Sequence, residues 1–556
     1  MSRLLRSKHH LLAFVGAFLL VGAPLGYFLS TLFTKEPPLP SFTEQACSLP
    51  ESWLERTKRG YLEGRAGEIS ILPRQPAYFS SGAGGWTHSG PWPFLQRVPL
   101  VFYGPGIIPK TGQVETPATL ADVAPTIATL LRGSVATEDG RSLDEVIELD
   151  AKLLNKPPPK LILTIVWDGG GWNVLEQWPG DWANLLGMME GGVSFLNATV
   201  GSSPSVTPSV HTTLGTGVFP ATHGITDIPV RDPESGELVD SFRGGRSSAF
   251  IETPTIAERW DEQTGNRAKV GMIGYEPWHL GMIGQGAERS GGDKDDAVWL
   301  DTETNEWKTN PASYTLPDAV AETAGLDEDL ARLDAADGKV DQAWGDQAIL
   351  DQQDRWEETP AFIEFHTRAM KSLIREEGYG KDEVTDLLFT NYKQIDRVGH
   401  YFNMASPEVN QSLLVTDDVL GETLEFLDEE VGRGKYVVVL TADHGQQPNA
   451  PDIDGYGVDP GELKRDIESA FGLVVDQVRP TEIFLDVAAL EASGKTVEDV
   501  ARFVGDYRLT ENNTDGEDPG MFGPSSRVIE LAIPSKMLES LDCSESPGSP
   551  ATPSSG

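Results

Sequence analysis

Unbroken apolar runs, rather than alternating apolar and polar positions, mark the strands that this sequence predicts. Residues 161–167 and 436–441 are almost wholly apolar and β-branched, and residues 387–392 form a weaker run of the same kind. A fourth run covers residues 98–103. Such runs are typical of strands that are buried on both faces of a parallel sheet. We therefore expect an α/β fold with a mostly parallel sheet.

A longer apolar run lies near the start of the chain. Residues 11–33 carry no charge over 23 positions, and they follow three basic residues between positions 3 and 8. This length can span a bilayer, and the basic cluster is expected to stay on its cytoplasmic side. We expect an uncleaved signal anchor that holds the protein at the cell membrane. The alternative is secretion after cleavage at residues 21–23, which Pro24 disfavours.

Proline-rich segments divide the rest of the chain. Residues 157–159 are three consecutive prolines, typical of a stiff linker, and the Ser/Pro/Gly-rich end of the chain is typical of disorder. The predicted organisation is a basic stub with a transmembrane helix at 1–33, a Pro-rich spacer at 34–45, a globular segment at 46–150, a linker at 151–160, a main α/β segment at 161–540 with inserts at about 226–360 and 446–520, and a disordered tail at 541–556.

Composition narrows the possible functions. The chain has 44 Lys and Arg residues against 85 Asp and Glu residues, for a net charge of −41. Without a cationic surface to displace phosphate counterions, a nucleic-acid polymer is not an expected partner. The two cysteines are too few for a disulfide scaffold or a cysteine metal cluster. Any metal must therefore be held by histidine and carboxylate side chains.

Acidic residues and histidines follow the predicted strands. Asp168 comes directly after the first run, Asp443 and His444 follow the run at 436–441, and Asp396 and His400 follow the run at 387–392. Ligands of open α/β sheets bind beyond the carboxyl ends of the strands, so these side chains are expected to meet there. Carboxylate oxygens and imidazole nitrogens suit Zn²⁺ or a similar divalent ion, and two such ions can assist phosphoryl transfer.

A candidate nucleophile lies in the loop between the first two of these strands. Residues 204–217 form a polar loop that turns into a helix of small residues, and Thr207 lies near the start of that helix. The helix dipole and a neighbouring metal ion would both favour the alkoxide of Thr207 and an incoming phosphate.

These motifs, in this order, resemble the alkaline phosphatase superfamily. The similarity is greatest to its threonine-nucleophile branch, the nucleotide pyrophosphatase/phosphodiesterases and related bacterial alkaline phosphatases. The resemblance implies a doubly wound sheet with helices on both faces and inserted cap regions, and a small-molecule phosphate ester as substrate. It also implies two zinc ions, the first bound by Asp168, Thr207, Asp443 and His444, and the second by Asp396, His400 and a further histidine downstream.

No histidine follows His444 in this sequence. The missing section resembles four segments near the other end of the chain, at 67–73, 87–91, 98–106 and 120–131. We therefore predict a circular permutation, in which 46–150 is the permuted C-terminal part of the catalytic domain and His88 is the last metal ligand. The alternative is a fragment left by duplication, with His88 an ordinary loop histidine.

The permutation also predicts a disulfide. Both new chain ends would lie at one place on the surface, and Cys47 and Cys543 lie beside those ends. In an oxidising compartment we expect them to be bonded, with Cα atoms within roughly 7 Å of each other. The alternative is two free thiols on the terminal segments.

Substrate preference is inferred from residues that phosphomonoesterases of this branch share and that this sequence lacks. Phosphomonoesterases of this branch resemble one another in an Asn shortly after the His-Gly-Ile element and in a Lys/Arg pair in the insert. Here Thr226 and Asp227 follow that element, which begins at His223, and the insert shows Glu276. A monoester dianion would lose charge-assisted hydrogen bonds, so phosphodiesters and nucleotide pyrophosphates are favoured. Phosphomonoester hydrolysis is the alternative.

Other functions and other residues receive simpler interpretations. A sulfatase is disfavoured because the sequence around Thr207 lacks the sulfatase motif. The predicted anchor and the threonine at position 207 both argue against a phosphoglycerate-mutase-like enzyme. An inactive surface binding module would predict an incomplete set of metal ligands, whereas the set with His88 is complete.

Three other histidines are expected to have structural roles in packing: His211, His223 and His366. Asp122 is expected to cap a helix or to pair locally. Trp278 and His279 are expected either to line a substrate pocket or to pack in the core.

Overall fold

The computed structural model describes residues 38–75, 77–79, 88–133, 137–147, 157–242, 247–289, 291–453, 455–512, 523 and 525–544. The predicted transmembrane helix and most of the predicted tail lie outside these residues. Among the described residues, no helix combines the length and the apolar character needed to cross a bilayer.

The main sheet confirms the predicted α/β class. Within the described residues it has nine strands in the order β13-β12-β11-β14-β6-β15-β3-β7-β4. The central strand β6 pairs in parallel with β14 and β15, while β3 runs antiparallel to β15. The strands are β3 (Leu100–Tyr103), β4 (Gly112–Val114), β6 (Leu161–Trp167), β7 (Val193–Phe195), β11 (Val270–Gly274), β12 (Asp296–Asp301), β13 (Glu306–Lys308), β14 (Asp386–Tyr392) and β15 (Tyr436–Thr441).

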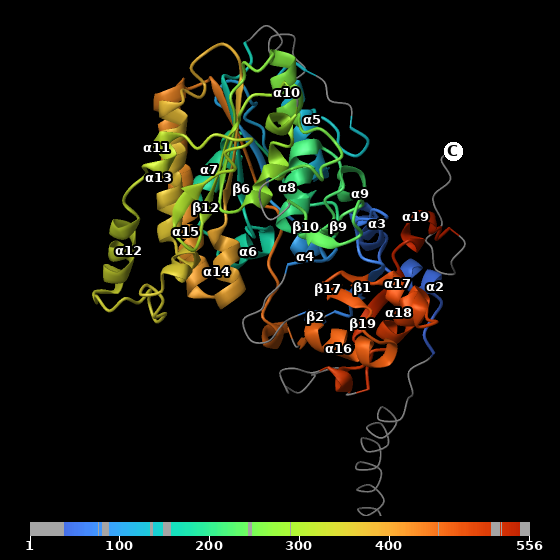
Figure 1. Cartoon of the computed structure of the whole chain (residues 1–556). Coiled ribbons are helices and arrows are strands. Elements are labelled where there is room, and N and C mark those ends of the chain that lie inside the picture. Colours follow the sequence, from blue (N-terminus) through green and yellow to red (C-terminus); the bar gives the residue numbers. More distant parts are fainter. Residues whose placement is uncertain are drawn as a thin grey trace, which may run out of the picture.

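Helices cover both faces of this sheet (Figure 1). Alternate residues of β6 point to opposite sides: Leu163 and Ile165 belong to one hydrophobic cluster, and Ile162 and Val166 belong to another. The first cluster includes α7 (Ala183–Gly191), α13 (Ala361–Glu376) and α15 (Pro407–Leu427), and the second includes α5 (Val123–Leu130), α8 (Thr207–Thr216) and α10 (Ile256–Thr264). Burial on both faces explains why the central strands are uniformly apolar.

A second, smaller domain joins the two ends of the chain. Its four-stranded sheet has the order β17-β18-β1-β19, and β1 pairs antiparallel with both neighbours. In Figure 1 the blue N-terminal elements lie among the orange and red C-terminal ones. The elements are α2 (Phe42–Cys47), β1 (Ile69–Pro73), α16 (Pro460–Phe471), β17 (Val475–Val478), β18 (Glu482–Leu485), α18 (Val497–Gly505) and β19 (Ile529–Pro534), with a hydrophobic core of their own.

The structure differs from the predicted boundaries in three places. Helix α2 begins at Phe42, inside the predicted spacer, because Ser41 caps it through a reciprocal bond with Glu44. The predicted insert at 226–360 contributes β11, β12 and β13 to the main sheet. The predicted insert at 446–520 contributes β17 and β18 to the smaller sheet, where β18 pairs with β1.

The predicted disulfide is confirmed. Cys47 and Cys543 are bonded, and their Cα atoms lie 5.4 Å apart although 496 positions separate them in sequence. The bond links the last residue of α2 to the segment after α19 (Met537–Ser540). Residues 541–544, the start of the predicted disordered tail, are therefore held against the smaller domain, where Lys58 Nζ also donates a hydrogen bond to the Leu541 carbonyl at 2.8 Å.

Candidate active site

The predicted ligands meet at the carboxyl edge of the main sheet. Asp168 directly follows β6, and Asp443 and His444 closely follow β15. Asp396 and His400 lie one turn apart in α14 (Gln394–Phe402), which begins just after β14. Because these strands are parallel neighbours, their ends deliver all five side chains to one place.

The first cluster consists of Asp168, Asp443 and His444. Their ligand atoms lie within 4.8 Å of one another, and all three residues are buried. His444 Nε2 lies 3.5 Å from both Asp168 Oδ1 and Asp443 Oδ2. Asp443 Oδ2 and His444 Nε2 are buried and make no hydrogen bond within the described part of the chain. Buried polar atoms without partners are costly, and a divalent cation would satisfy them.

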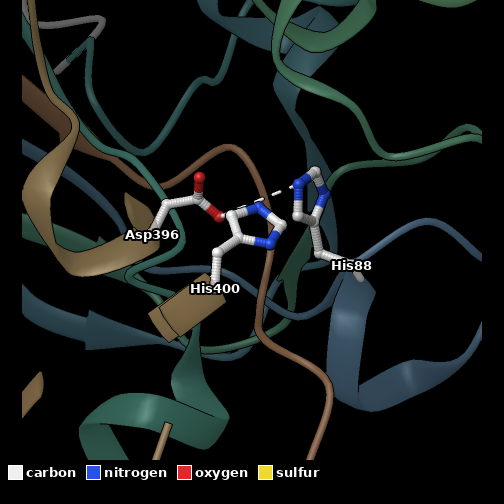
Figure 2. A group of neighbouring side chains, drawn as sticks. All are labelled: His88, Asp396 and His400. Atoms are coloured by element: carbon white, nitrogen blue, oxygen red, sulfur yellow. Dashed lines mark ion pairs between the residues drawn. The ribbon is translucent and has the colours of Figure 1, made fainter. Parts of the chain in front are cut away.

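The second cluster consists of His88, Asp396 and His400 (Figure 2). Asp396 Oδ1 lies 3.7 Å from His88 Nε2 and 3.4 Å from His400 Nε2. His88 Nδ1 lies 2.9 Å from the Ser205 carbonyl, which can only accept, so Nδ1 carries the proton and Nε2 keeps its lone pair. Burial, followed by repulsion from His444, holds the pKa of His88 well below its usual range. Its Nε2 is therefore available as a metal ligand.

The two clusters are in direct contact. The rings of His88 and His444 are stacked, with centroids 3.6 Å apart and planes 3° from parallel. The structure thus brings the histidine from the N-terminal segment beside residues that follow it by more than 300 positions. His88 reaches this place from the loop that precedes α4 (Pro93–Gln96) and β3.

Thr207 is the first residue of α8 and is buried beside the clusters. Its Oγ1 accepts a hydrogen bond from Lys393 Nζ at 3.2 Å. The following Pro208 is favourable in the first turn of a helix, where an N–H has no intrahelical partner. The hydroxyl therefore lies where the helix N-terminus meets the two clusters.

Lys393 is the site residue that the sequence analysis missed. Besides Thr207, its Nζ contacts Asp168 Oδ1 at 2.9 Å and Asp396 Oδ2 at 2.8 Å, so it joins both clusters to the hydroxyl. Burial would lower the pKa of Lys393, but Asp168 and then Asp396 raise it, so the ammonium stays charged. A lysine directly after an apolar strand and three residues before Asp396 is the signal in the sequence.

The carboxylates carry more negative charge than the neighbouring groups neutralise. Burial, and then repulsion from Asp443, raise the pKa of Asp168 well above its usual range. For Asp396, burial acts in the same direction, but attraction to His400 and Lys393 outweighs it and lowers the pKa. The three aspartates thus surround one ammonium, a charge balance that fits additional cations.

Glycines after β6 allow these loops to approach one another. Gly169 has φ of +69°, and a Cβ there would lie 2.8 Å from Asp396 Cβ. The Gly169 N–H donates to Asp443 Oδ1 at 3.0 Å, which fixes that carboxylate while its other oxygen faces His444. A side chain at this position would therefore separate the two clusters.

A layer of buried polar residues supports the first cluster. Asn391 donates to Asp168 Oδ2 at 3.0 Å, and His211 Nε2 lies 3.5 Å from Asp443 Oδ2. His211 Nδ1 in turn lies 3.0 Å from His279 Nδ1. His211 and His279 are thus buried partners behind the first cluster. This position is more specific than the packing expected for His211, and it differs from the pocket lining that was one of the two expectations for His279.

The other polar candidates have the structural roles expected of them. His223 Nε2 lies 3.1 Å from Thr213 Oγ1, and His366 Nε2 lies 2.8 Å from Thr390 Oγ1, both in the core. Asp122 accepts from the Thr119 N–H at 2.7 Å and so caps the turn that precedes α5.

Glu276, rather than a cation, approaches the site from the segment after β11. The pKa of Glu276 is raised to about 7. Burial is the main cause and repulsion from Glu357 adds to it, while attraction to Lys393 acts in the opposite direction. The Arg397 guanidinium, which also attracts this carboxylate, is paired with Glu357. Next to it, Trp278 Nε1 donates to Asp240 Oδ2 at 3.3 Å.

Comparison with known proteins assigns the chain to a family. The sequence model of the type I phosphodiesterase/nucleotide pyrophosphatase family matches residues 162–515. The chain belongs to this family. The match includes all three strand-end motifs and Thr207, whereas the segment that carries His88 precedes it.

This phosphodiesterase-family chain is similar to two bacterial alkaline phosphatases. It is 24% identical over 418 residues to alkaline phosphatase PafA of Elizabethkingia meningoseptica, across 64% of this chain and 73% of that protein. It is 24% identical over 330 residues to alkaline phosphatase PhoV of Synechococcus elongatus, across 52% of this chain and 59% of that protein. The chain is thus a phosphoester hydrolase of the alkaline phosphatase superfamily.

The fold of this phosphodiesterase-family chain agrees with that assignment. The crystal structure of wild-type PafA matches it with a TM-score of 0.51 at 20% identity, over 63% of this chain and 76% of that one. The large, mostly parallel sheet expected from the sequence is therefore an alkaline-phosphatase-like sheet.

Proposed function

We propose that the protein hydrolyses phosphodiesters and nucleotide pyrophosphates, with Thr207 as the nucleophile. The reaction uses two divalent metal ions, for which zinc is the first candidate. The observation that carries this proposal is the meeting of two His/carboxylate clusters, both contacted by Lys393, beside the hydroxyl at the start of α8. Buried ligand atoms without hydrogen-bond partners support the presence of cations.

The donor sets indicate which residues would hold the two ions. Asp168, Asp443 and His444, with Thr207, would hold the first. The second would be held by His88, Asp396 and His400. Imidazole and carboxylate donors together suit Zn²⁺. When bound, the ions supply positive charge that favours deprotonation of a hydroxyl or a water and stabilises charge on phosphoryl oxygens.

The chain's own residues account for the two chemical steps. Thr207 Oγ1 forms a bond to phosphorus while the bond from phosphorus to the leaving oxygen breaks, and that oxygen takes up a proton. Lys393 donates to Oγ1 and stabilises negative charge there as the hydroxyl proton is lost. Water then attacks phosphorus, releases the phosphoryl group and restores the Thr207 hydroxyl. The N–H groups in the first turn of α8 offer hydrogen bonds to phosphoryl oxygens.

The preference for diesters rests on Glu276. In the segment where the resemblance to phosphomonoesterases leads us to expect cations, the chain has Glu276, whose pKa burial raises to about 7, and Arg397 is already paired with Glu357. A monoanionic diester or pyrophosphate needs fewer positive charges. Phosphomonoester hydrolysis is the second candidate, and the similarity to two alkaline phosphatases favours it.

The circular permutation is part of the same proposal. Its support is the position of His88 in the second cluster, the pairing of β1 with β19, and the disulfide beside the two chain ends. The alternative, a fragment left by duplication, does not predict that His88 Nε2 lies 3.7 Å from Asp396 Oδ1.

We also propose an extracytoplasmic location, with a single-pass anchor at residues 11–33 or secretion as the alternative. The support is the disulfide, since disulfides persist in oxidising compartments. Both forms of the proposal place the catalytic domain outside the cytoplasm.

The deciding experiment compares an aryl phosphate with its diaryl diester, in the wild type and in Thr207→Ala. We expect the diester to be hydrolysed faster by the wild type. Thr207→Ala should lose at least about 10²-fold in kcat on both substrates, because the nucleophile is gone. Its metal content should stay near that of the wild type, because Asp168, Asp443 and His444 remain to hold the first ion. Thr207→Ser is the matched control and should keep much of the activity.

Two outcomes would contradict the proposal. Equal activity of Thr207→Ala and the wild type would exclude Thr207 as the nucleophile. A faster rate with the monoester would replace the diester preference by the phosphomonoesterase alternative.

A further inference from the structure

A third cluster of carboxylates lies far from the catalytic site. Asp261, in α10, meets Asp293 and Asp295, in the loop before β12, with ligand oxygens within 4.8 Å of one another. Asp296 begins β12, which runs parallel to β11, so this cluster lies at the amino edge of the main sheet. The catalytic residues follow the carboxyl ends of the strands, so the two places are at opposite edges.

Two members of this cluster are buried, and one of them has an oxygen without a partner in the described part of the chain. Asp261 is 6% exposed and Asp295 is 7% exposed. Asp261 Oδ1 is fully shielded from solvent and has no hydrogen-bond partner among the described residues. Burial, and then Asp293, raise the pKa of Asp261 to about 7. Burying carboxylates together in this way is unfavourable unless a cation accompanies them.

A further carboxylate and an open space adjoin the cluster. Glu258 is 5% exposed, and its Oε1 lies 3.0 Å from Arg289. A cleft of about 270 Å³ is bordered by Glu258, Asp261 and Glu262, and Arg289 is the one cation among its described lining residues. Gly286 lies between these acids, since a Cβ on it would be 3.5 Å from Glu258 Cγ and 3.7 Å from Asp295 Oδ2.

We propose that Asp261, Asp293 and Asp295 bind a divalent cation, Ca²⁺ in preference to Mg²⁺ or Zn²⁺. All the donors are carboxylate oxygens, with no imidazole or thiol among the three, and hard cations prefer such donors. Ca²⁺ accepts the irregular geometry of a loop, whereas Mg²⁺ demands a near-ideal octahedron. The ion ties the C-terminal half of α10 to the start of β12 and stabilises this edge of the sheet.

The test measures Ca²⁺ binding to the full chain after its zinc content has been restored, by equilibrium dialysis and by the shift in Tm. We expect the wild type to bind one Ca²⁺ per chain and to gain thermal stability. Asp293→Asn should weaken binding at least tenfold, because it removes one charged ligand. Asp293 is exposed, so this variant is expected to fold. Diester hydrolysis and zinc content should stay unchanged in it, because the cluster is remote from the catalytic edge.

Glu303→Gln is the matched control, since Glu303 is an exposed acid beyond the other end of β12. It should bind Ca²⁺ like the wild type. Equal binding by Asp293→Asn and Glu303→Gln would overturn the proposal and assign the binding to the acidic surface as a whole. Absence of Ca²⁺ binding to the wild type would also overturn it, and would leave Asp261 and Asp293 sharing a proton. Equally tight binding of Mg²⁺ would overturn the preference for Ca²⁺.

Discussion

At the scale of single residues, Lys393 is the residue that makes the candidate site one unit. Its ammonium contacts an aspartate of each cluster and the Thr207 hydroxyl. A buried ammonium is costly, and here three aspartates offset that cost and keep it charged. The group therefore brings a fixed positive charge to the oxygen of the proposed nucleophile, Thr207.

Replacing Lys393 with Met should lower kcat/KM by about 10²-fold, the usual loss when one donor to a developing oxyanion is removed. Metal content should stay near that of the wild type, because Lys393 is not among the proposed ligands. Lys371→Met is the control, since Lys371 forms an ion pair with Glu422 on the surface. Wild-type kcat/KM in Lys393→Met would show that the hydrogen bond to Thr207 has no part in the reaction.

At the scale of elements, the site depends on a strand and a loop that come from the other end of the chain. Strand β3 lies between β15 and β7 in the main sheet, and the loop before it carries His88. Gly445, just after His444, donates its N–H to the Leu95 carbonyl at 2.8 Å, which fixes the first cluster against the N-terminal segment. The segment 88–103 is thus built into the catalytic edge.

His88→Ala tests whether this segment completes the second metal site. We expect bound zinc to fall toward one equivalent and the rate to fall by about 10²-fold, as for the loss of a metal ligand. Elemental analysis and diester hydrolysis provide the two measurements. Two equivalents of zinc and an unchanged rate in this variant would return His88 to the role of an ordinary loop histidine.

At the scale of the whole molecule, the two ends of the chain meet in the smaller domain. The disulfide closes nearly the entire chain into one loop, since the cysteines are separated by 496 positions in sequence. In the chain-entropy model, a disulfide stabilises mainly by restricting the unfolded chain, and the effect is greater for longer loops. The bond thus stabilises a domain whose sheet is drawn from both ends of the chain.

Replacing both cysteines with serine should lower the free energy of unfolding of the smaller domain by about 2–5 kcal/mol. The measurement is urea denaturation of the oxidised wild type, the reduced wild type and the double variant. The reduced wild type should resemble the double variant, and reductant should leave the double variant unchanged. Two titratable thiols in the unfolded, unreduced wild type would contradict the disulfide.

The sequence predicts the centre of the molecule better than its edges. Strands β6 and β15 are unbroken apolar runs because both faces are buried, and this signal is local. By contrast, β11 contains two glycines in five residues, and its place in the sheet depends on parallel partners far along the chain. Lys393 was missed because its role depends on three side chains delivered by other elements.

The strand order of the smaller sheet also sets an order of events during biosynthesis. Strand β1 leaves the ribosome early, yet both of its partners, β18 and β19, come from beyond residue 480. At typical rates of synthesis, those partners follow after roughly 20–90 s. The nascent chain therefore carries an apolar strand with two unpaired edges while the rest of the protein is made. A chaperone that shields this strand during synthesis would protect the protein from aggregation.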